Sequence, residues 1–566
     1  MSPYLEENGT ATVHRHQAKD TPRVTPPSPQ SEKRPDGVAD SKTVSPGIFE
    51  DNERHEPERA PLRTVFPALE LEEHAVDEHE SRRAIVVGAG PAGITAGILL
   101  QHKVPGLDLT ILERNSDVGG VWNSNIYPGV RCDVPSDVYQ TTFSPKTDWS
   151  ANYGRGAEIK AYWKGLVAKY NLGNTIQLSH RVLEARWSEA LAKWQIRVEH
   201  LGAVRVEEAD FLITATGHFS DPRLPSYPGI ETFQGHLRHT SNYDPAFDAA
   251  GKRVAVIGNG ASGIQVLPQL QKVAKSLDHY ARSPTWIAGS FGGEKIPPST
   301  SDSRELAPQD AQGYTQFRKS IENKSFDRFS IIFKDQLPNK KARETFQGLM
   351  AARLGDKRDE LLDAVTPSFS PNCRRLTPGP GIATPGYPNL FFLLGPNSTG
   401  PGGTLPHSLE NSVTYIAKVL RKVSSQRIRT IQPTEAATRD FRAYCESFFP
   451  RTVMSENCSS WYNGGINGGR IHGIWPGSGS HLNIVRRQVR WEDYEYTYLN
   501  RQGNRFGYFG NGWSVKDIQA AELATSKQET TGEDGEREVD FSSYLKPEAV
   551  DGKLDLRDYH ESWWDL

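Results

Sequence analysis

A glycine-rich turn behind a short apolar stretch limits what this chain can fold into more than any other feature. Residues 84–87 are apolar, which predicts a buried parallel strand, and residues 94–101 predict the helix behind it. Between them, Gly88, Gly90 and Gly93 form the pattern G-x-G-x-x-G. In a nucleotide-binding βαβ unit the first glycine permits a tight turn, the second lets the backbone approach a pyrophosphate, and the third lets helix and strand pack closely.

A second strand that ends in an acid strengthens this interpretation. Residues 109–112 predict the strand, and Glu113 follows it, 20 residues after Gly93. A carboxylate at this distance is placed to hold the hydroxyls of a ribose. The alternative is an ordinary strand–turn–helix whose glycines serve only packing, and the combination of strand, glycines and acid argues against it.

The same arrangement returns later in the chain with one difference. The glycine pattern is repeated by Gly258, Gly260 and Gly263. Residues 253–257 and 277–281 predict strands on either side, and the second strand leads into Arg282 with no acid at the ribose position. An arginine there suits a 2′-phosphate, so this unit is predicted to prefer NADPH to NADH; the alternative is a solvated cation at a strand end. The sequence therefore predicts an α/β fold with two Rossmann-like dinucleotide-binding domains.

Composition excludes several classes of function. With 36% hydrophobic residues and a formal net charge of -3, the chain has no electrostatic reason to bind nucleic acid or an anionic membrane. No apolar run approaches the length of a membrane span, and the N-terminus lacks the apolar core of a signal peptide. We therefore expect no nucleic-acid partner and no stable membrane insertion.

Cysteine usage points to a reducing, cytoplasmic compartment. The cysteines are Cys132, Cys373, Cys445 and Cys458, and they form no C-x-x-C pair. This spacing predicts neither a disulfide framework nor a zinc or other metal site. It also argues against a disulfide reductase, another class of flavoprotein with two Rossmann units.

The residues that follow Glu113 resemble a known family. Residues 119–122 are Gly-Gly-Val-Trp and residues 127–133 are Tyr-Pro-Gly-Val-Arg-Cys-Asp. Together they resemble the class B flavoprotein monooxygenases, and in particular the flavin-proximal loop of the Baeyer–Villiger branch. The chain is similar to fungal FAD-binding monooxygenases of secondary metabolism. Residues 211–217 end in Ala-Thr-Gly and resemble the element that links the FAD and NADPH domains of that family.

The Baeyer–Villiger fingerprint, F-x-G-x-x-x-H-x-x-x-W followed by Pro or Asp, is present with one departure. Phe233, Gly235, His239 and Asp244 match it, and Tyr243 stands at the tryptophan position. An aromatic of this kind is closer to the N- and S-oxygenating relatives, so the fingerprint leaves the branch open. For His239 we expect a structural or hinge role rather than direct chemistry.

The resemblance implies two catalytic residues. In Baeyer–Villiger enzymes a fixed cation stabilises the negative charge that develops when activated oxygen attacks a ketone. Residues 372–381 resemble the segment that carries this arginine, and Arg375 is the matching position. Asp133 would pair with Arg375 and hold its orientation. The alternative for Arg375 is a surface or phosphate-contacting arginine, because Arg374 beside it is equally charged.

The resemblance also implies the cofactors, FAD and NADPH, and the residues that hold them. The residues expected around FAD are Gly88, Gly90, Pro91, Ala92, Gly93, Glu113, Gly120, Val121, Trp122, Asp133 and Tyr139. Those expected around NADPH are Gly258, Gly260, Ser262, Gly263, Arg282 and Ser283.

A block of sequence is missing after Gly381. Relatives carry several tens of residues there, including strands, whereas here the chain continues at once into residues 382–398, which resemble the return into the FAD domain. A doubly wound domain needs more than two parallel strands, and no buried strand of the right kind occurs between Ala281 and Leu390. We predict a truncated NADPH domain with impaired cofactor binding. The alternatives are that another segment supplies the strands, or that the sequence lacks coding segments.

These features predict a domain order. Residues 1–80 form a disordered N-terminal extension, with a short helix possible over residues 68–76, because their polar composition cannot bury enough apolar surface. The segments that follow are the first part of the FAD domain (81–222), the NADPH domain (223–381) with a helical insertion at about 289–370, the returning part of the FAD domain (382–520) and a polar tail (521–566).

The predicted function is insertion of one oxygen atom from O2 into a small organic substrate, with FAD and NADPH as cofactors. The resemblance favours oxidation of a ketone to an ester or lactone in secondary metabolism. An N- or S-oxygenating monooxygenase is a second hypothesis. A third is a flavin-binding remnant or an uncoupled NADPH oxidase, because of the missing block.

Overall fold

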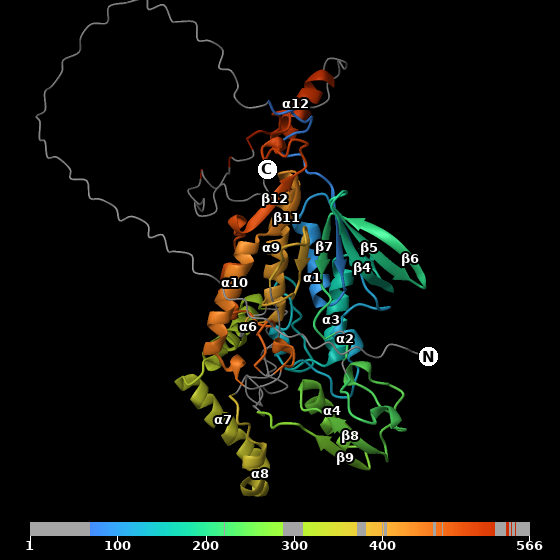
Figure 1. Cartoon of the computed structure of the whole chain (residues 1–566), viewed down its shortest axis with the longest axis vertical. Coiled ribbons are helices and arrows are strands. Elements are labelled where there is room, and N and C mark those ends of the chain that lie inside the picture. Colours follow the sequence, from blue (N-terminus) through green and yellow to red (C-terminus); the bar gives the residue numbers. More distant parts are fainter. Residues whose placement is uncertain are drawn as a thin grey trace, which may run out of the picture. The chain divides into compact units, whose positions relative to one another are not determined.

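The structure is a computed structural model. It describes residues 68–219, 221–222, 224–286, 310–370, 381–398, 400, 404–456, 460–466, 468–526, 539–542, 545 and 550. The chain divides into two units, Met1–Pro67 and Ala68–Leu566. The first unit lies outside the described residues, and everything below concerns the second (Figure 1).

A parallel five-stranded sheet carries the first glycine turn. The strands, in the order β10-β7-β1-β2-β3, are Leu390–Phe392, Phe211–Thr214, Arg82–Val87, Leu107–Leu112 and Ile176–Gln177. The first turn leads from β1 into helix α1 (Pro91–Lys103), as predicted. The central strands are apolar because helices or strands cover both faces, and Ala84, Ile85 and Val86 are fully buried. We call this sheet with its helices the first nucleotide unit.

Helices and smaller sheets cover the first nucleotide unit. Helix α9 (Leu405–Ser425) packs against α1, and α3 (Gly156–Lys169) lies beside it (Figure 1). The antiparallel sheet β4-β5-β6 consists of His180–Ser188, Lys193–His200 and Ala203–Ala209, and β11 (Ile428–Pro433) pairs with β12 (Tyr494–Tyr498). The sheet positions α1 and the ends of β1 and β2, where the nucleotide is expected.

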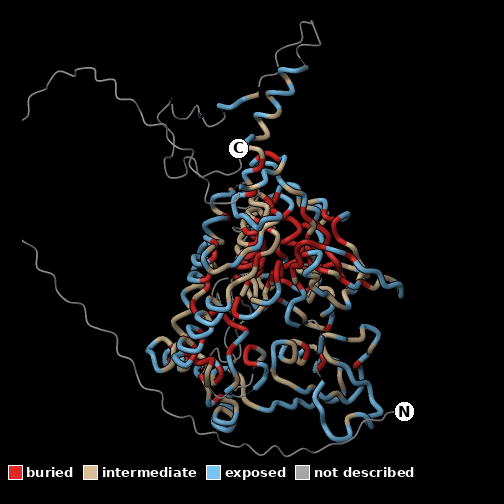
Figure 2. The backbone as a smooth tube through the Cα atoms, turned by 45° about the horizontal axis from the view of Figure 1, so that its top comes forward, coloured by how far each residue is buried: buried red, intermediate tan, exposed pale blue. Residues whose placement is uncertain are grey.

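The second glycine turn lies in a much smaller unit. Strand β8 (Arg253–Ile257) runs parallel to β9 (Ser276–Tyr280), and helix α4 (Ala261–Gln271) connects them. Within the described part of the chain no further strand pairs with either one. Figure 2 shows the buried residues concentrated around the first sheet, whereas every residue of β8 is exposed or half-buried. The truncation predicted for this second nucleotide unit is therefore confirmed for the described residues.

The predicted helical insertion is present in its described part. Its helices are α6 (Ala311–Phe326), α7 (Leu337–Leu354) and α8 (Arg358–Val365). The remaining helices of the described residues are α2 (Val121–Ser124), α10 (Glu435–Phe448), α11 (Gly479–Val485) and α12 (Val515–Ser526). The 3-10 turns are Ser136–Val138 (η1), Leu172–Asn174 (η2), Ile230–Thr232 (η3), Thr240–Asn242 (η4), Asp327–Ile332 (η5), Gly355–Lys357 (η6), Phe449–Arg451 (η7), Val453–Ser455 (η8), Trp461–Asn463 (η9), Trp491–Asp493 (η10) and Gly507–Phe509 (η11).

Residues 68–80 differ from the prediction. They contain no helix, and they are held by the C-terminal part instead of forming part of a disordered extension. The backbone N–H of Val76 donates to the carbonyl of Trp513 (2.8 Å), and that of Asn511 donates to the carbonyl of His74 (3.0 Å). Ala75 is fully buried. The local composition is polar, and long-range contacts order the segment, which include hydrogen bonds from Asn500 to Glu72 and from Val515 to Asp77.

Candidate active site

One cavity joins the two glycine turns. It has a volume of about 2830 Å³ and extends from the end of β1 to the end of β9. Every predicted cofactor-binding residue lines it except Gly93. The first unit contributes Gly88, Gly90, Pro91, Ala92, Glu113, Gly120, Val121, Trp122, Asp133 and Tyr139, and the second contributes Gly258, Gly260, Ser262, Gly263, Arg282 and Ser283. The structure thus brings together residues that lie up to about 200 positions apart in the chain.

The first turn requires its glycines for steric reasons. Gly88 has φ +108°, and a Cβ there would lie 2.6 Å from the carbonyl oxygen of Ala215. A Cβ on Gly93 would collide with the carbonyl oxygen of Gly88, so Gly93 serves helix packing. A Cβ on Gly120 would lie 2.9 Å from Cα of Gly90, so the two backbones cross in contact. The result is a cradle without side chains at the N-terminus of α1, which fits a pyrophosphate.

Glu113 sits at the end of β2 and supports this cradle. Its Oε2 accepts a hydrogen bond from the backbone N–H of Ala89 (2.7 Å), and its Oε1 accepts from the backbone N–H (2.9 Å) and Nδ2 (2.6 Å) of Asn115. The side chain is buried yet borders the cavity. A carboxylate offers about four acceptor positions, and three are used here, so Oε2 still has one acceptor position for a ribose hydroxyl that FAD would present.

An aromatic pair, the half-buried Trp122 and the buried Tyr139, supports the cavity wall beyond Gly120. Trp122 Nε1–H donates to the hydroxyl of Tyr139 across 3.2 Å, and their rings are 5.6 Å apart. Burial raises the pKa of the Tyr139 hydroxyl, which therefore stays protonated. Burial, together with the charge of Asp133, also raises the pKa of the Cys132 thiol, so this cysteine is not a nucleophile.

The second turn is more open than the first. A Cβ on Gly258 or Gly260 would meet nothing within 4 Å, whereas one on Gly263 would lie 2.5 Å from the carbonyl oxygen of Gly258. The carboxyl end of β9 brings Arg282 and Ser283 to the same cavity. An open glycine turn beside a cation and a hydroxyl fits the phosphates of NADPH, although few strands support the turn.

Only one residue of the predicted catalytic pair lies within the described residues. Asp133 is exposed and lines the cavity. Arg375 lies in residues 371–380, outside the described residues, as does Arg374. Phe369, just before this segment, lines the same cavity. The pairing of Asp133 with Arg375 therefore stays a prediction.

The fingerprint segment contributes to the contact between the first and the second nucleotide unit. His239 caps the 3-10 turn η4, because its Nδ1 accepts from the backbone N–H of Ser241 (3.2 Å). The turn places Tyr243 against an apolar cluster that contains Tyr127, Val266 and Leu270. This arrangement agrees with a structural role for His239.

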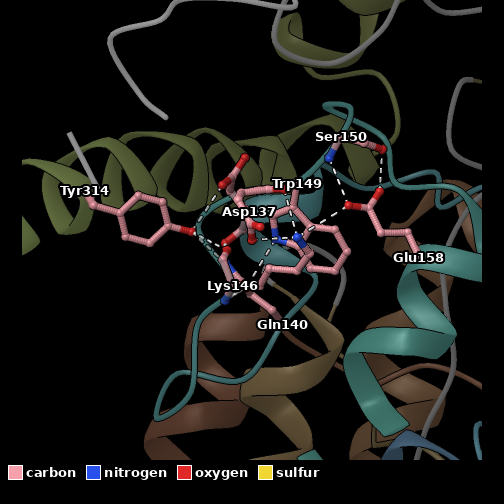
Figure 3. Close-up of polar contacts among 8 residues, drawn as sticks. Asp137, Gln140, Lys146, Trp149, Ser150, Glu158 and Tyr314 are labelled. Atoms are coloured by element: carbon pink, nitrogen blue, oxygen red, sulfur yellow. Dashed lines mark hydrogen bonds and ion pairs between the residues drawn. The ribbon is translucent and has the colours of Figure 1, made fainter. Parts of the chain in front are cut away.

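Helix α6 of the insertion is anchored close to the Trp122–Tyr139 pair. The Tyr314 hydroxyl donates to Asp137 Oδ1 (3.1 Å) and accepts from Nε2 of Gln140 (2.8 Å), as Figure 3 shows. Arg318, one turn further on, donates to the backbone carbonyls of Gln140 and Thr141 (both 3.1 Å). These contacts fix the insertion to the segment that carries Tyr139.

Sequence reasoning missed part of the cavity lining. Trp286, Phe346 and Phe369 form an aromatic wall, in which Trp286 Nε1–H donates to the carbonyl of Phe369 (2.8 Å). The Trp286 and Phe346 rings are 6.4 Å apart. Only the aromatic content of the insertion could have pointed to this wall. Also missed was His218, directly after the Ala-Thr-Gly element; partial desolvation of its ring, with the nearby His472, lowers its pKa.

Two negative findings concern the described residues alone. None of their helices is both long and apolar enough to cross a bilayer. No three His, Cys, Asp or Glu side chains among them are grouped so that they could hold a metal ion.

Comparisons with known proteins agree with this geometry. A family model described as flavin-binding monooxygenase-like matches residues 81–299. The FAD-binding monooxygenase tazF of Aspergillus terreus is 30% identical over 515 residues, which cover 76% of this chain and 91% of tazF. A Baeyer–Villiger monooxygenase of Streptomyces coelicolor is 26% identical over 490 residues, covering 74% of this chain and 93% of that protein. The solved structure of cyclohexanone monooxygenase from Rhodococcus sp. Phi1 bound to NADP+ matches with a TM-score of 0.62 at 21% identity, covering 74% of this chain and 100% of that one.

Proposed function

The chain belongs to the FAD-binding monooxygenases of the Baeyer–Villiger type, and from this premise we propose that it oxidises a ketone to an ester or lactone. The observation that carries the proposal is the single cavity onto which both glycine turns open, with Asp133 on its wall. When bound, FAD and NADPH supply the redox chemistry: a hydride from NADPH reduces the flavin, and one atom of O2 then enters the substrate while the other leaves as water.

The residues of the first nucleotide unit bind FAD and orient it. The crossing backbones at Gly90 and Gly120 leave room for the pyrophosphate of FAD, and the buried carboxylate of Glu113 takes a ribose hydroxyl. In the second unit, Arg282 and Ser283 take the 2′-phosphate of NADPH. As the resemblance implies, Asp133 would pair with Arg375, and this cation would stabilise the oxyanion that forms from the ketone.

An apolar substrate suits the aromatic part of the cavity wall. Trp286, Phe346 and Phe369 form this part, and the same cavity is also lined by Leu394, Leu405 and Leu409. Such a surface binds a hydrophobic ketone by burial of apolar area and excludes water from the reacting centre. A polyketide- or terpenoid-derived ketone of secondary metabolism is of this kind.

Two other functions are each favoured by one observation. Tyr243, at the tryptophan position of the fingerprint, favours oxygenation of an amine or sulfide. The two-stranded second unit favours impaired NADPH binding, and with it a flavin protein that does not complete turnover.

One experiment separates the three. FAD-loaded protein is titrated anaerobically with NADPH while the visible absorbance of the flavin is followed, and the reduced protein is then mixed with O2 and either a ketone or an amine. Bleaching followed by ester or lactone formation supports the proposal. An N-oxide would replace it with the second function, and a flavin that stays oxidised would replace it with the third.

A further inference from the structure

The side chain of Gln265 joins helix α4 to the loop formed by residues 127–133. Its Oε1 accepts from the hydroxyl of Tyr127 (2.9 Å) and from the backbone N–H of Arg131 (3.3 Å). Its Nε2 donates to the backbone carbonyl of Arg131 (3.1 Å). The amide therefore pairs with the backbone of Arg131 on both sides, as a neighbouring strand would. It lies five residues after Gly260 of the second glycine turn.

Backbone contact and apolar packing reinforce this link. Gly129 has φ +87°, and a Cβ there would lie 2.6 Å from the carbonyl oxygen of Gln265, so no side chain fits between loop and helix. Tyr127 is buried in the cluster that contains Val266 and Leu270 of α4, and Val130 packs against it. The 127–133 loop is therefore attached to the second nucleotide unit at several points.

The same loop also forms part of the first site. It ends in Asp133, which lines the cavity, and it follows Trp122, whose indole is fixed by Tyr139. A shift of α4 relative to the loop would change the separation between the two nucleotide sites. Hydride transfer depends steeply on that separation, since a displacement of about 1 Å at a reacting centre can cost on the order of 100-fold in rate.

Resting on the proposed function, we propose that Gln265 is a positioning residue for hydride transfer. It holds the loop of the first site at a fixed place relative to the second glycine turn. The hydride carries two electrons from NADPH to the flavin, and NADP+ and reduced flavin are the products. Gln265 exchanges no proton and touches neither reacting atom.

The test compares Gln265→Leu with a matched control, Gln271→Leu, which makes the same change at an exposed position of the same helix. Both proteins are loaded with FAD and compared with the wild type. The measurements are the limiting rate of flavin reduction at saturating NADPH, the Kd of NADP+, FAD content, Tm, and the change in the absorbance of oxidised flavin when NADP+ binds.

We expect Gln265→Leu to lower the limiting reduction rate by roughly 10- to 100-fold while the Kd of NADP+ changes by less than about threefold. FAD content is expected to stay unchanged, and the change in flavin absorbance on NADP+ binding is expected to shrink. Gln271→Leu should match the wild type in every measurement. Gln265→Glu keeps the acceptor for Tyr127 and for the N–H of Arg131 but loses the donor to the carbonyl of Arg131. Its limiting reduction rate should therefore lie between those of Gln265→Leu and the wild type. Tyr127→Phe, which removes one hydrogen bond and keeps the ring, provides a milder second variant.

A wild-type rate in Gln265→Leu overturns the inference, and so does a loss of rate that merely follows a loss of bound FAD. If NADPH fails to reduce the wild-type flavin, the proposed function is wrong. The attachment of the 127–133 loop by Gln265 is then tested by measurements that need no turnover. In that case, faster hydrogen exchange at the amide of Arg131 and a smaller NADP+-induced absorbance change in Gln265→Leu support it. Exchange and absorbance equal to those of the wild type overturn it.

Discussion

Glu113 Oε2 accepts a hydrogen bond of 2.7 Å from the backbone N–H of Ala89, the residue between the first two glycines of the first turn. The acid at the end of β2, for which we proposed a ribose contact, thus also shapes the glycine cradle. Its other oxygen is engaged by Asn115. The carboxylate therefore links the turn to the two strands that support it.

Glu113→Gln is expected to lower FAD affinity and to destabilise the protein by about 1–3 kcal/mol. The amide group of glutamine would turn a donor toward N–H groups that need an acceptor. FAD content after gel filtration and the free energy of unfolding in urea measure both effects. Glu189→Gln, at an exposed position, is the control and should change neither. Full FAD content in Glu113→Gln would contradict the assignment.

Gly120→Ala is expected to abolish FAD binding. Gly120 has φ +56°, and the added Cβ would lie 2.9 Å from Cα of Gly90, inside the cradle. Gly106→Ala is a matched control, because Gly106 has φ +66° but nothing lies within 4 Å of its Cβ position. Both variants pay a backbone cost of about 1 kcal/mol, and only the first changes the site. Equal FAD content in the two proteins would rule out a steric role for this contact.

Arg282→Ala is expected to remove the preference for NADPH. Loss of a charge-assisted contact with the 2′-phosphate should raise the KM for NADPH by roughly tenfold or more and leave that for NADH nearly unchanged. Initial rates of cofactor oxidation with both nucleotides test this. Lys275→Ala, an exposed change in the same unit, is the control. If both KM values rise together, Arg282 contributes only general affinity.

Acid stability should depend on Asp117, which precedes Gly119. Its carboxylate lies 2.9 Å from Lys160 Nζ and 3.0 Å from Lys164 Nζ of helix α3, and Lys160 above all lowers the pKa of Asp117 from 3.8 to about 2. Because the folded pKa lies below the unfolded one, the stabilisation is complete above pH 4 and is lost as the pH falls toward 2. Tm measured against pH should therefore fall less steeply between pH 4 and 2 in Asp117→Asn than in the wild type. The exposed Asp278→Asn should keep the wild-type slope.

Tyr314→Phe is expected to loosen the helical insertion. The change removes the hydroxyl that bonds Asp137 and Gln140, at a cost of about 1–2 kcal/mol. Urea unfolding measures the loss, and hydrogen exchange over residues 311–326 locates it. Tyr444→Phe is the control, because Tyr444 is 48% exposed. Unchanged exchange in α6 would show that other contacts hold the insertion.

The sequence predicted the local units of the fold because their signals are local. An apolar run followed by spaced glycines specifies a strand, a turn and a helix, and both β1 and β8 occur where that pattern placed them. The small number of strands around β8 was also predicted from local signals, because no buried strand pattern occurs between Ala281 and Leu390. Strand order and the helical cover depend on contacts between distant residues and leave little trace in any one segment.

The site was predictable to the same extent. Glycines, Glu113 and Arg282 stand at fixed spacings from their turns, so spacing alone brought them to the cavity wall. The role of Gln265 was not predicted, because a single polar residue on a half-buried helix gives no signal in the sequence. Only the structure shows its partner, the loop at Arg131. The order of residues 68–80 was missed for the same reason, since the segment depends on Trp513 and Asn511 from the far end of the chain.

Among its described residues, the small second unit does not form a hydrophobic core by itself. Tyr127 and Val130, contributed by the loop of the first unit, fill part of the cluster that holds α4 to β8 and β9. Cut out on its own, the second unit would leave this cluster open to water. The second unit therefore completes this cluster only when the loop of the first unit is in place, and we expect it to be less stable when expressed alone than within the whole chain.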